Sequence, residues 1–371
     1  MKKVLIAPDS FKGTLSTTQA ADIIAAAVTE RYPDCIIEKL PMADGGEGSV
    51  EAVIAAVDGR PEYVQVQSPD DKSITAHFGV TTDNTAVLEV AQSTGITRQV
   101  GLHPMTSNTY GFGQLIIRAL ELGLRNFFLC IGGSASTDAG CGMVAALGVQ
   151  FLDSAEQPFV PSGATLHKIA GIDASGIDSR VRDSTFTVMC DVDNPLYGEN
   201  GAAYVYGPQK GASVVEVRVL DQGLRHVGKI CKQAFGVDYA GVPGTGAAGG
   251  LGFGCMTMLK ANLVSGIDAI LDLCDFKNRL IGADLIITGE GRLDNQSFSG
   301  KALSGILRNA EGVPVISICG VNAAGEDMLN KHDLAVFEIS KDNSVEEGMR
   351  NPEDCLKRGT RKALEAIVKS S

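Results

Sequence analysis

Acidic, hydroxyl and lysine side chains recur in six glycine- or proline-rich segments of this 371-residue chain. Phosphoryl transfer needs this inventory: backbone and lysine donors for phosphates, carboxylates for Mg²⁺, and one carboxylate to take a hydroxyl proton. The segments are residues 8–13, 42–49, 132–138, 190–195, 207–211 and 289–301. The sequence therefore predicts an enzyme that handles phosphate groups.

Four aspartates are the candidates for metal binding and proton transfer. Asp191 and Asp193 lie two residues apart, so on an extended strand both would face the same way and could hold Mg²⁺, with Asp191 also acting in catalysis. Asp44 or Asp294 would accept the hydroxyl proton. Two of these predictions have a structural alternative, because residues 193–195 also suit an Asx turn and Asp44 precedes two glycines typical of a turn.

Three cationic side chains are candidates for phosphate or substrate carboxylate. Lys12, with a predicted catalytic role, and Lys301 could reach phosphates, although a lone loop lysine is more often solvated. Arg292 suits a carboxylate, because its guanidinium can donate two parallel hydrogen bonds. Lys301 does not belong to a P-loop, since Asn295 stands where that motif needs glycine and no Ser or Thr follows the lysine.

Other polar residues complete the predicted binding set: Ser10, Ser134, Lys210 and Glu290. Ser134 opens a Ser-Ala-Ser-Thr-Asp run that could hold a phosphate at a helix N-terminus. The same run could simply cap that helix. Both alternatives stay open from the sequence.

A glycine run at residues 244–254 contains a GxGxxG pattern. No strand precedes it, so a dinucleotide-binding fingerprint is not supported. We expect instead that Gly246, Gly249 and Gly250 present N–H groups to phosphate where a helix over residues 252–261 begins.

Composition narrows the class of protein. The net charge of −12 disfavours nucleic acid or anionic membrane as a partner. Nine cysteines without a CxxC pair favour a reducing compartment, and neither a signal peptide nor a long apolar run is present. Scattered histidines give no support to triad hydrolysis or a zinc site. We expect a cytoplasmic protein with small-molecule substrates.

The apolar segments predict two α/β domains. Strands and helices alternate at both ends of the chain, which favours one parallel sheet built from residues 1–62 and 282–371. Its predicted strands are residues 4–7, 35–40, 285–288, 313–318 and 334–339. Short strands at 63–66, 74–80 and 85–90 have a different spacing, so we assign residues 63–281 to an inserted α/β domain, with the active site in the cleft between the two domains.

Seven motifs in order resemble the bacterial glycerate kinase family, of the type 1, glycerate 2-kinase-like kind. They are APDSFKGTLS, PMADGGEGS, GGSASTDAG, CDVDNPLYG, GPQKGA, GTGAAGGLGFG and TGEGRLDNQSFSGK. Ser297 and Ala139 are the small departures from the family pattern. The resemblance implies flavodoxin-like and restriction-enzyme-like domains. It also implies Mg²⁺-dependent transfer of the ATP γ-phosphoryl group to D-glycerate, giving ADP and phosphoglycerate, with the 2-phosphate favoured and the 3-phosphate as the alternative.

Two other functions fit the same residues. One is a kinase for another short hydroxy acid, since several small acids place a hydroxyl beside a carboxylate. The other is a nucleotide-binding regulatory protein without turnover. Release of ADP that depends on D-glycerate and Mg²⁺ would separate these from a glycerate kinase.

Overall fold

The computed structural model describes residues 1–43, 45–46, 48–298, 301–341 and 344–370. These form two compact units. Unit 1 comprises Met1–Asp44, Glu51–Asp58 and Gly266–Ser371, and unit 2 comprises Gly45–Val50 and Gly59–Ser265. The stretch from Gly266 to residue 281, which the sequence prediction gave to the inserted domain, belongs to unit 1.

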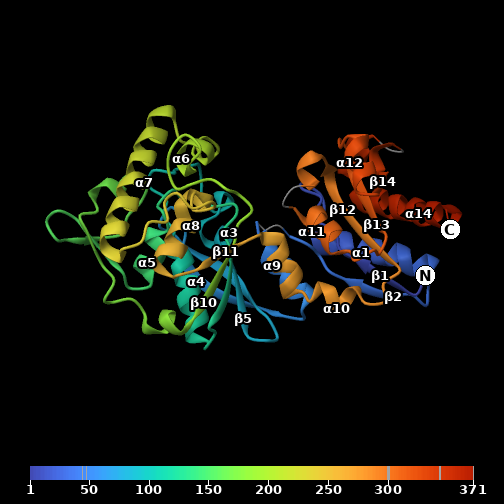
Figure 1. Ribbon diagram of the computed structural model, residues 1–371, viewed down its shortest axis with the longest axis horizontal. Coiled ribbons are helices and arrows are strands. Elements are labelled where there is room, and N and C mark those ends of the chain that lie inside the picture. The colour runs from blue at the N-terminus through green and yellow to red at the C-terminus, as the bar shows by residue number, and fades with distance from the viewer. Residues whose placement is uncertain (44, 47, 299–300, 342–343, 371) are drawn as a thin grey trace. The chain divides into compact units, whose positions relative to one another are not determined.

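Unit 1 is built on a five-stranded parallel sheet, as the sequence predicted. Its order is β2-β1-β12-β13-β14, so strands from the two ends of the chain lie side by side, blue next to orange and red in Figure 1. The strands are β1 (Lys3–Ile6), β2 (Ile36–Lys39), β12 (Leu285–Leu293), β13 (Val315–Asn322) and β14 (Ala335–Glu338). This is the flavodoxin-like order. The chain adds β2 on one side of β1 and then β12, β13 and β14 on the other side, so the strand order reverses between β1 and β12.

The helices of unit 1 pack around this sheet. They are α1 (Thr17–Arg31), α2 (Ser49–Ala56), α9 (Gly266–Leu273), α10 (Phe276–Leu280), α11 (Ala302–Asn309), α12 (Glu326–Lys331), α13 (Val345–Arg350) and α14 (Pro352–Ser370), with 3-10 turns η5 (Asn295–Phe298) and η6 (Ile339–Lys341). A capping box opens α1: Ser16 Oγ accepts from Gln19 N at 3.2 Å, and Ser16 N donates to Gln19 Oε1 at 2.9 Å. Val4, Leu5 and Ile6 are fully buried, as expected for a parallel strand covered on both faces.

Unit 2 contains a six-stranded mixed sheet and a small three-stranded sheet. The large sheet has the order β11-β10-β6-β5-β4-β3, parallel from β11 to β5 and antiparallel over the last two strands. Its strands are β3 (Arg60–Gln67), β4 (Ser73–Val80), β5 (Thr85–Glu89), β6 (Asn126–Cys130), β10 (Thr185–Met189) and β11 (Asn262–Val264). The small antiparallel sheet contains β7 (Gln150–Leu152), β8 (Pro158–Phe159) and β9 (Gly171–Asp173).

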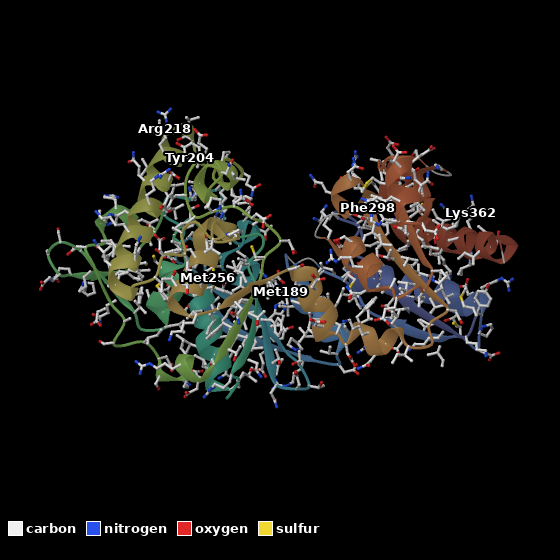
Figure 2. All side chains as sticks on the ribbon, in the orientation of Figure 1. Met189, Tyr204, Arg218, Met256, Phe298 and Lys362 are labelled. Atoms are coloured by element: carbon white, nitrogen blue, oxygen red, sulfur yellow. The ribbon has the colours of Figure 1, made fainter. Side chains whose placement is uncertain are left out.

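Helices of unit 2 supply much of its apolar core. They are α3 (Val90–Thr94), α4 (Tyr110–Glu121), α5 (Cys141–Ala146), α6 (Ala202–Tyr206), α7 (Val214–Phe235) and α8 (Ala247–Met258), with the 3-10 turns η1 (Ile96–Arg98), η2 (Leu166–Lys168), η3 (Ser179–Asp183) and η4 (Pro208–Lys210). A capping box at Ser213 and a left-handed Gly236 delimit α7. Polar Arg218 lies on the outer face of this helix (Figure 2). Among the described residues, no helix is both long and apolar enough to cross a membrane.

Candidate active site

A pocket of about 360 Å³ lies at the carboxyl ends of β1, β12 and β13 in unit 1. It occupies the point where the strand order reverses, which is where open parallel sheets bind ligands. The loop after β1, the end of β12 and the start of α11 supply its charged groups and one hydroxyl. They are Asp9, Ser10, Lys12, Glu290, Arg292, Asp294 and Lys301. Six of these seven were predicted site residues, and Asp9 is the addition. The hydroxyls of Thr14, Ser340 and Ser344 line the pocket as well.

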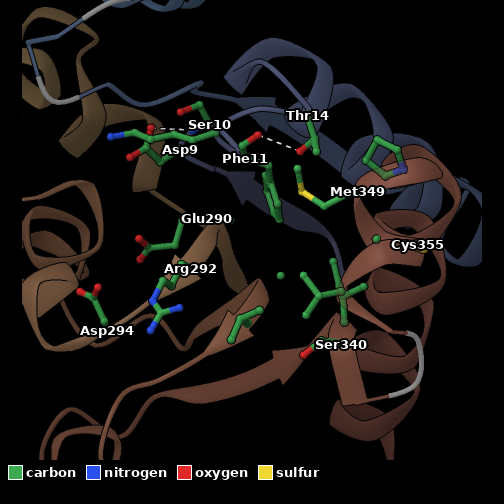
Figure 3. A pocket seen from close by; sticks show the side chains of 18 of the residues that line it. Asp9, Ser10, Phe11, Thr14, Glu290, Arg292, Asp294, Ser340, Met349 and Cys355 are labelled. Carbon is green, nitrogen blue, oxygen red and sulfur yellow. Dashed lines mark hydrogen bonds between the residues drawn. The ribbon is translucent and has the colours of Figure 1, made fainter. Parts of the chain in front are cut away.

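The end of β12 carries the central side chains of the pocket. The sequence predicted a loop from Gly289 onward, and this is wrong, because β12 continues to Leu293 and its pairing with β13 includes Glu290 and Arg292. Alternate residues of a strand share a face. Glu290 and Arg292 therefore project on the same side, and Figure 3 shows them together with Asp294 along one side of the pocket.

Glu290 has an unusual protonation equilibrium. The pKa of its carboxyl group is raised to about 7, mainly by burial and also by the charges of Asp9 and Asp294, while a hydrogen bond from Ser297 and the charge of Lys301 oppose the shift. A carboxyl group that titrates near neutral pH is suited to proton transfer. The sequence prediction placed Glu290 among binding residues only, because burial cannot be read from a glycine-rich segment.

The loop after β1 is a tight turn that brings Ser10 and Lys12 to the pocket. Phe11 and Leu15 exchange backbone hydrogen bonds at 3.0 and 3.1 Å, and Phe11 O accepts from the Thr14 hydroxyl at 2.8 Å (Figure 3). Buried Phe11 anchors this turn, whereas Lys12 is exposed. The chain thus holds the backbone of the turn and leaves the lysine ammonium accessible to a ligand.

Asp294 and Lys301 lie on either side of η5. Asp294 Oδ1 accepts from Gln296 N at 2.9 Å, so one carboxylate oxygen already caps this turn. The ring of Phe298, labelled in Figure 2, stacks on His332 at 5.1 Å and fixes the end of η5. Lys301 lines the pocket at the start of α11.

Lys210 in unit 2 is buried, whereas the other predicted lysines reach a pocket. Its Nζ donates to Ser134 Oγ at 3.0 Å and to Ser136 O at 2.6 Å. Burial lowers the pKa of Lys210 to about 7, and the charge of Asp138 opposes the shift. The structure thus gives Lys210 and Ser134 a role in holding the loop, which the sequence did not suggest. Their contact with a phosphate stays a prediction.

Asp138, the last residue of the Ser-Ala-Ser-Thr-Asp run, binds backbone N–H groups at the starts of α4 and α5. Its Oδ2 accepts from Thr109 N at 2.8 Å, Thr109 Oγ1 at 2.7 Å and Gly142 N at 3.0 Å. Three buried side-chain oxygens of this loop have no hydrogen-bond partner among the described residues. They are Ser136 Oγ, Thr137 Oγ1 and the second carboxylate oxygen of Asp138, Oδ1. Buried polar atoms in proteins are usually paired, so these three are notable.

The glycine run packs against backbone. Ala248, Gly249 and Gly250 have left-handed φ values of 54, 70 and 88°, so the regular part of α8 begins after them, where the sequence predicted a helix from residue 252, and it ends at Met258. Gly246 N donates to Asn194 O at 2.8 Å and Gly250 N to Gly246 O at 3.3 Å, which corrects the prediction that these two N–H groups face phosphate. A Cβ on Gly249 would lie 2.1 Å from Ser136 O. The run therefore allows close approach of two loops.

Asp191 and Asp193 lie beyond the end of β10 in an irregular segment. Both are exposed, and the strand ends at Met189. The argument from two-residue spacing on a strand therefore does not apply to them. Next to this pair, Asn194 is structural, since its side chain donates to Asn200 O at 2.7 Å and accepts from the Tyr206 hydroxyl at 2.6 Å. Metal binding by the two aspartates stays a prediction.

A fully buried carboxylate, Glu89, was missed by the sequence analysis. It accepts from Gly48 N at 3.1 Å and from Val50 N at 3.4 Å, at the start of α2, where a negative charge is favourable. Glu89 lies inside an apolar run of the sequence, and no motif there indicated that its carboxylate binds the start of a helix. Asp44, one of the predicted proton acceptors, lies outside the described residues, and its role stays a prediction.

Metal binding has no preformed site of protein ligands in the part of the chain that the structure describes. No group of three or more His, Cys, Asp or Glu side chains that could hold a metal ion occurs among these residues. Mg²⁺ in phosphoryl-transfer enzymes is commonly held by one or two carboxylates together with substrate phosphates and water. Asp191 and Asp193 offer carboxylates of this kind.

Known proteins share both the sequence and the fold. The family model described as the glycerate kinase family matches residues 4–368. The chain belongs to the glycerate kinase family. A glycerate kinase of Bacillus subtilis is 42% identical, with 91% of this chain and 90% of the relative covered. A glycerate 2-kinase of Escherichia coli is 38% identical, with coverage of 97% and 96%.

A solved structure supports the same relationship. It comes from Salmonella typhimurium LT2 and carries a provisional assignment as glycerate kinase 2. The TM-score is 0.87 at 34% identity, and the match covers 100% of this chain and 99% of the other. The glycerate kinase family thus accounts for the two-unit α/β fold and for the seven motifs together.

Proposed function

We propose that this protein is a glycerate kinase that transfers the γ-phosphoryl group of ATP to D-glycerate with Mg²⁺, giving ADP and 2-phospho-D-glycerate. Membership of the glycerate kinase family supports the ATP-dependent kinase activity. The name of the Escherichia coli relative, a glycerate 2-kinase, favours the 2-hydroxyl as the acceptor. The 3-hydroxyl is the alternative, since moving the acceptor by one carbon needs only a small change of substrate pose.

The pocket at the carboxyl ends of β1 and β12 is the observation that carries this proposal. It combines a half-buried carboxyl group, Glu290, with the cations Lys12, Arg292 and Lys301. Phosphoryl transfer requires mainly positioning and charge stabilisation, with one group to accept the hydroxyl proton. The side chains of this pocket offer a candidate for each of these roles, which supports the proposal.

Glu290 is the favoured proton acceptor in this mechanism. In its ionised form it accepts the hydroxyl proton of D-glycerate as the hydroxyl oxygen bonds to the γ-phosphorus and the bond to the β-phosphate oxygen of ADP breaks. Asp294, the acceptor expected from the sequence, already uses one oxygen to cap η5. Asp44 remains the other sequence-based candidate.

The cationic side chains have separate roles. Arg292 binds the glycerate carboxylate, because its planar guanidinium suits two parallel hydrogen bonds to two oxygens. Lys12 and Lys301 neutralise phosphate charge, and Ser10 donates to a substrate oxygen. Asp191 and Asp193 are the residues that would hold Mg²⁺, which supplies positive charge at the phosphates when bound.

A single incubation tests the proposed function. The purified protein, ATP, Mg²⁺ and D-glycerate are mixed, ADP release is followed, and the product is analysed by phosphorus NMR. We expect ADP release that requires both D-glycerate and Mg²⁺, with a phosphorus signal coupled to the proton on carbon 2. Glycolate, lactate and L-glycerate in place of D-glycerate identify a kinase for another hydroxy acid. ATP binding without ADP release under any of these conditions would refute the kinase activity.

A further inference from the structure

The pocket of unit 1 has two unlike sides. Its polar side carries the carboxyl and cationic groups described above. Its other side is mainly apolar and is formed by Phe11, Val321, Ile339, Val345, Met349 and Cys355, with the hydroxyl-bearing Ser340 and Ser344 next to them in the chain. Figure 3 shows the separation: Glu290, Arg292 and Asp294 lie on one side, and Met349 and Cys355 lie on the other.

Helix α13 contributes exposed apolar side chains to this second side. Val345 is 52% exposed and Met349 is 56% exposed. They are four residues apart, so they share one face of the helix. Ile339 and Cys355, by contrast, are buried and form a closed floor. The apolar side thus combines two buried side chains, Ile339 and Cys355, with two exposed ones, Val345 and Met349, that a ligand could cover.

D-Glycerate does not account for this side of the pocket. Each of its carbons carries oxygen, so it gains little from an apolar wall. The pocket volume of about 360 Å³ lies in the range of sites for larger ligands, about 300–1,000 Å³. A ligand with a flat apolar part and a strongly anionic part fits both sides.

We propose that the apolar side of this pocket binds the adenine base of ATP, with the triphosphate directed toward Lys12 and Lys301. This assignment rests on the proposed kinase function and places the nucleotide in unit 1. The polar side has three cations facing Asp9, Glu290 and Asp294. A proton on Glu290 or a metal ion on the nucleotide makes this side net positive, which favours a polyphosphate.

Gly348 offers a way to fill the adenine site without removing any side chain. It lines the pocket on α13, and a Cβ built on it meets no atom within 4 Å. Leucine also has a higher helix propensity than glycine, so Gly348→Leu is expected to fold. Gly348→Ala provides a smaller step in the same direction. Gly325→Leu is the matched control, because Gly325 is exposed, meets nothing within 4 Å and lies outside the pocket.

The experiment measures equilibrium binding of Mg-ATP and of inorganic tripolyphosphate to the full chain. For the wild type we expect ATP to bind tighter than tripolyphosphate, because only ATP carries the base. In Gly348→Leu we expect the Kd of ATP to rise roughly tenfold or more, and the Kd of tripolyphosphate to stay within about twofold. Gly348→Ala should give a smaller rise in the same direction, and Gly325→Leu should bind both as the wild type does.

Three results would overturn the assignment. They are an unchanged Kd for ATP in Gly348→Leu, an equal loss for ATP and tripolyphosphate, or a rise in the KM of D-glycerate with no change for ATP. Binding is measured without turnover. A wild type that binds ATP through this pocket but phosphorylates no acid would therefore refute the proposed function and leave the adenine site standing.

Discussion

Glu290 in unit 1 and Lys210 in unit 2 show how the same physical cause gives two different sites. Burial brings the pKa of both groups to about 7, from below for the glutamate and from above for the lysine. Glu290 faces a pocket of about 360 Å³. Lys210 is enclosed and donates to two oxygens of its own chain, Ser134 Oγ and Ser136 O.

The difference lies in what surrounds each group. Around Glu290, the cations Lys12 and Lys301 and the side chain of Arg292 line a space that a ligand can enter. Around Lys210, the neighbouring groups are the loop that it holds and the closely packed glycine run. A perturbed pKa alone therefore does not identify a catalytic residue, and access to a ligand decides between chemistry and structure.

The largest expected effect comes from Glu290→Gln. The variant keeps the shape of the side chain but cannot accept a proton, so we expect kcat to fall by about 10²–10⁴-fold, the usual contribution of general base catalysis. Steady-state ADP release at saturating substrates measures it. Glu326→Gln, an exposed glutamate of the same unit outside the pocket, is the control and should keep wild-type kcat. Activity of Glu290→Gln within threefold of the wild type would remove Glu290 from the reaction.

Asp191→Asn tests whether unit 2 also takes part in chemistry. We expect most turnover to be lost, with a higher Mg²⁺ concentration needed for half-maximal rate, because an amide is a weaker ligand for Mg²⁺ than a carboxylate. The thermal midpoint should not change, since Asp191 is exposed. Glu199→Gln, an exposed acid of the same unit, is the matched control. Normal activity at low Mg²⁺ would contradict a metal-binding role.

Lys210→Met tests the structural role of the buried lysine. Removal of the amino group leaves Ser134 Oγ and Ser136 O without this donor, and we expect a net loss of ~1–2 kcal/mol in the free energy of unfolding. Urea denaturation at pH 9 measures it, with exposed Lys168→Met as control. If stability is unchanged while the KM of ATP rises, Lys210 contacts the nucleotide and the structural assignment is wrong.

Glu290 and Lys210 should contribute slopes of opposite sign to the dependence of the unfolding free energy on pH. Between pH 4.5 and about 7 the folded state holds more protons on Glu290 than the unfolded state does, so Glu290 lowers stability as pH rises through this window. Between about 7 and 10.5 the unfolded state holds more protons on Lys210, so Lys210 raises stability as pH rises. Urea titrations across pH should show the first slope reduced in Glu290→Gln and the second in Lys210→Met. Unchanged slopes would show that these groups titrate normally.

Local sequence signals predicted the secondary structure well where the residues of one element are enough to determine its conformation. The apolar strand predicted over residues 4–7 is present as β1, which runs from Lys3 to Ile6. The end of β12 was missed because its charged and glycine residues are typical of loops, whereas pairing with β13 makes it a strand. The rule that alternate residues share a face was applied to Asp191 and Asp193, and it holds at Glu290 and Arg292 instead.

The candidate site was predictable in its residue types but not in its partners. Motif positions identified Lys12, Arg292 and Lys301, and these line one pocket. Burial of Lys210 depends on how unit 2 packs, which no spacing along the chain reveals. The apolar side with Val345 and Met349 was also missed, because two apolar residues on a short helix look like ordinary core positions in sequence.

Hydrogen exchange of the full chain with and without Mg-ATP tests most directly the claim that the unit 1 pocket holds the nucleotide. We predict slower exchange of backbone amides in residues 9–15 and 344–352, with residues 134–140 and 244–252 changed little. The reverse pattern, with slower exchange at residues 134–140 and 244–252 and none at the pocket, would contradict the account and return the nucleotide to the glycine run of unit 2.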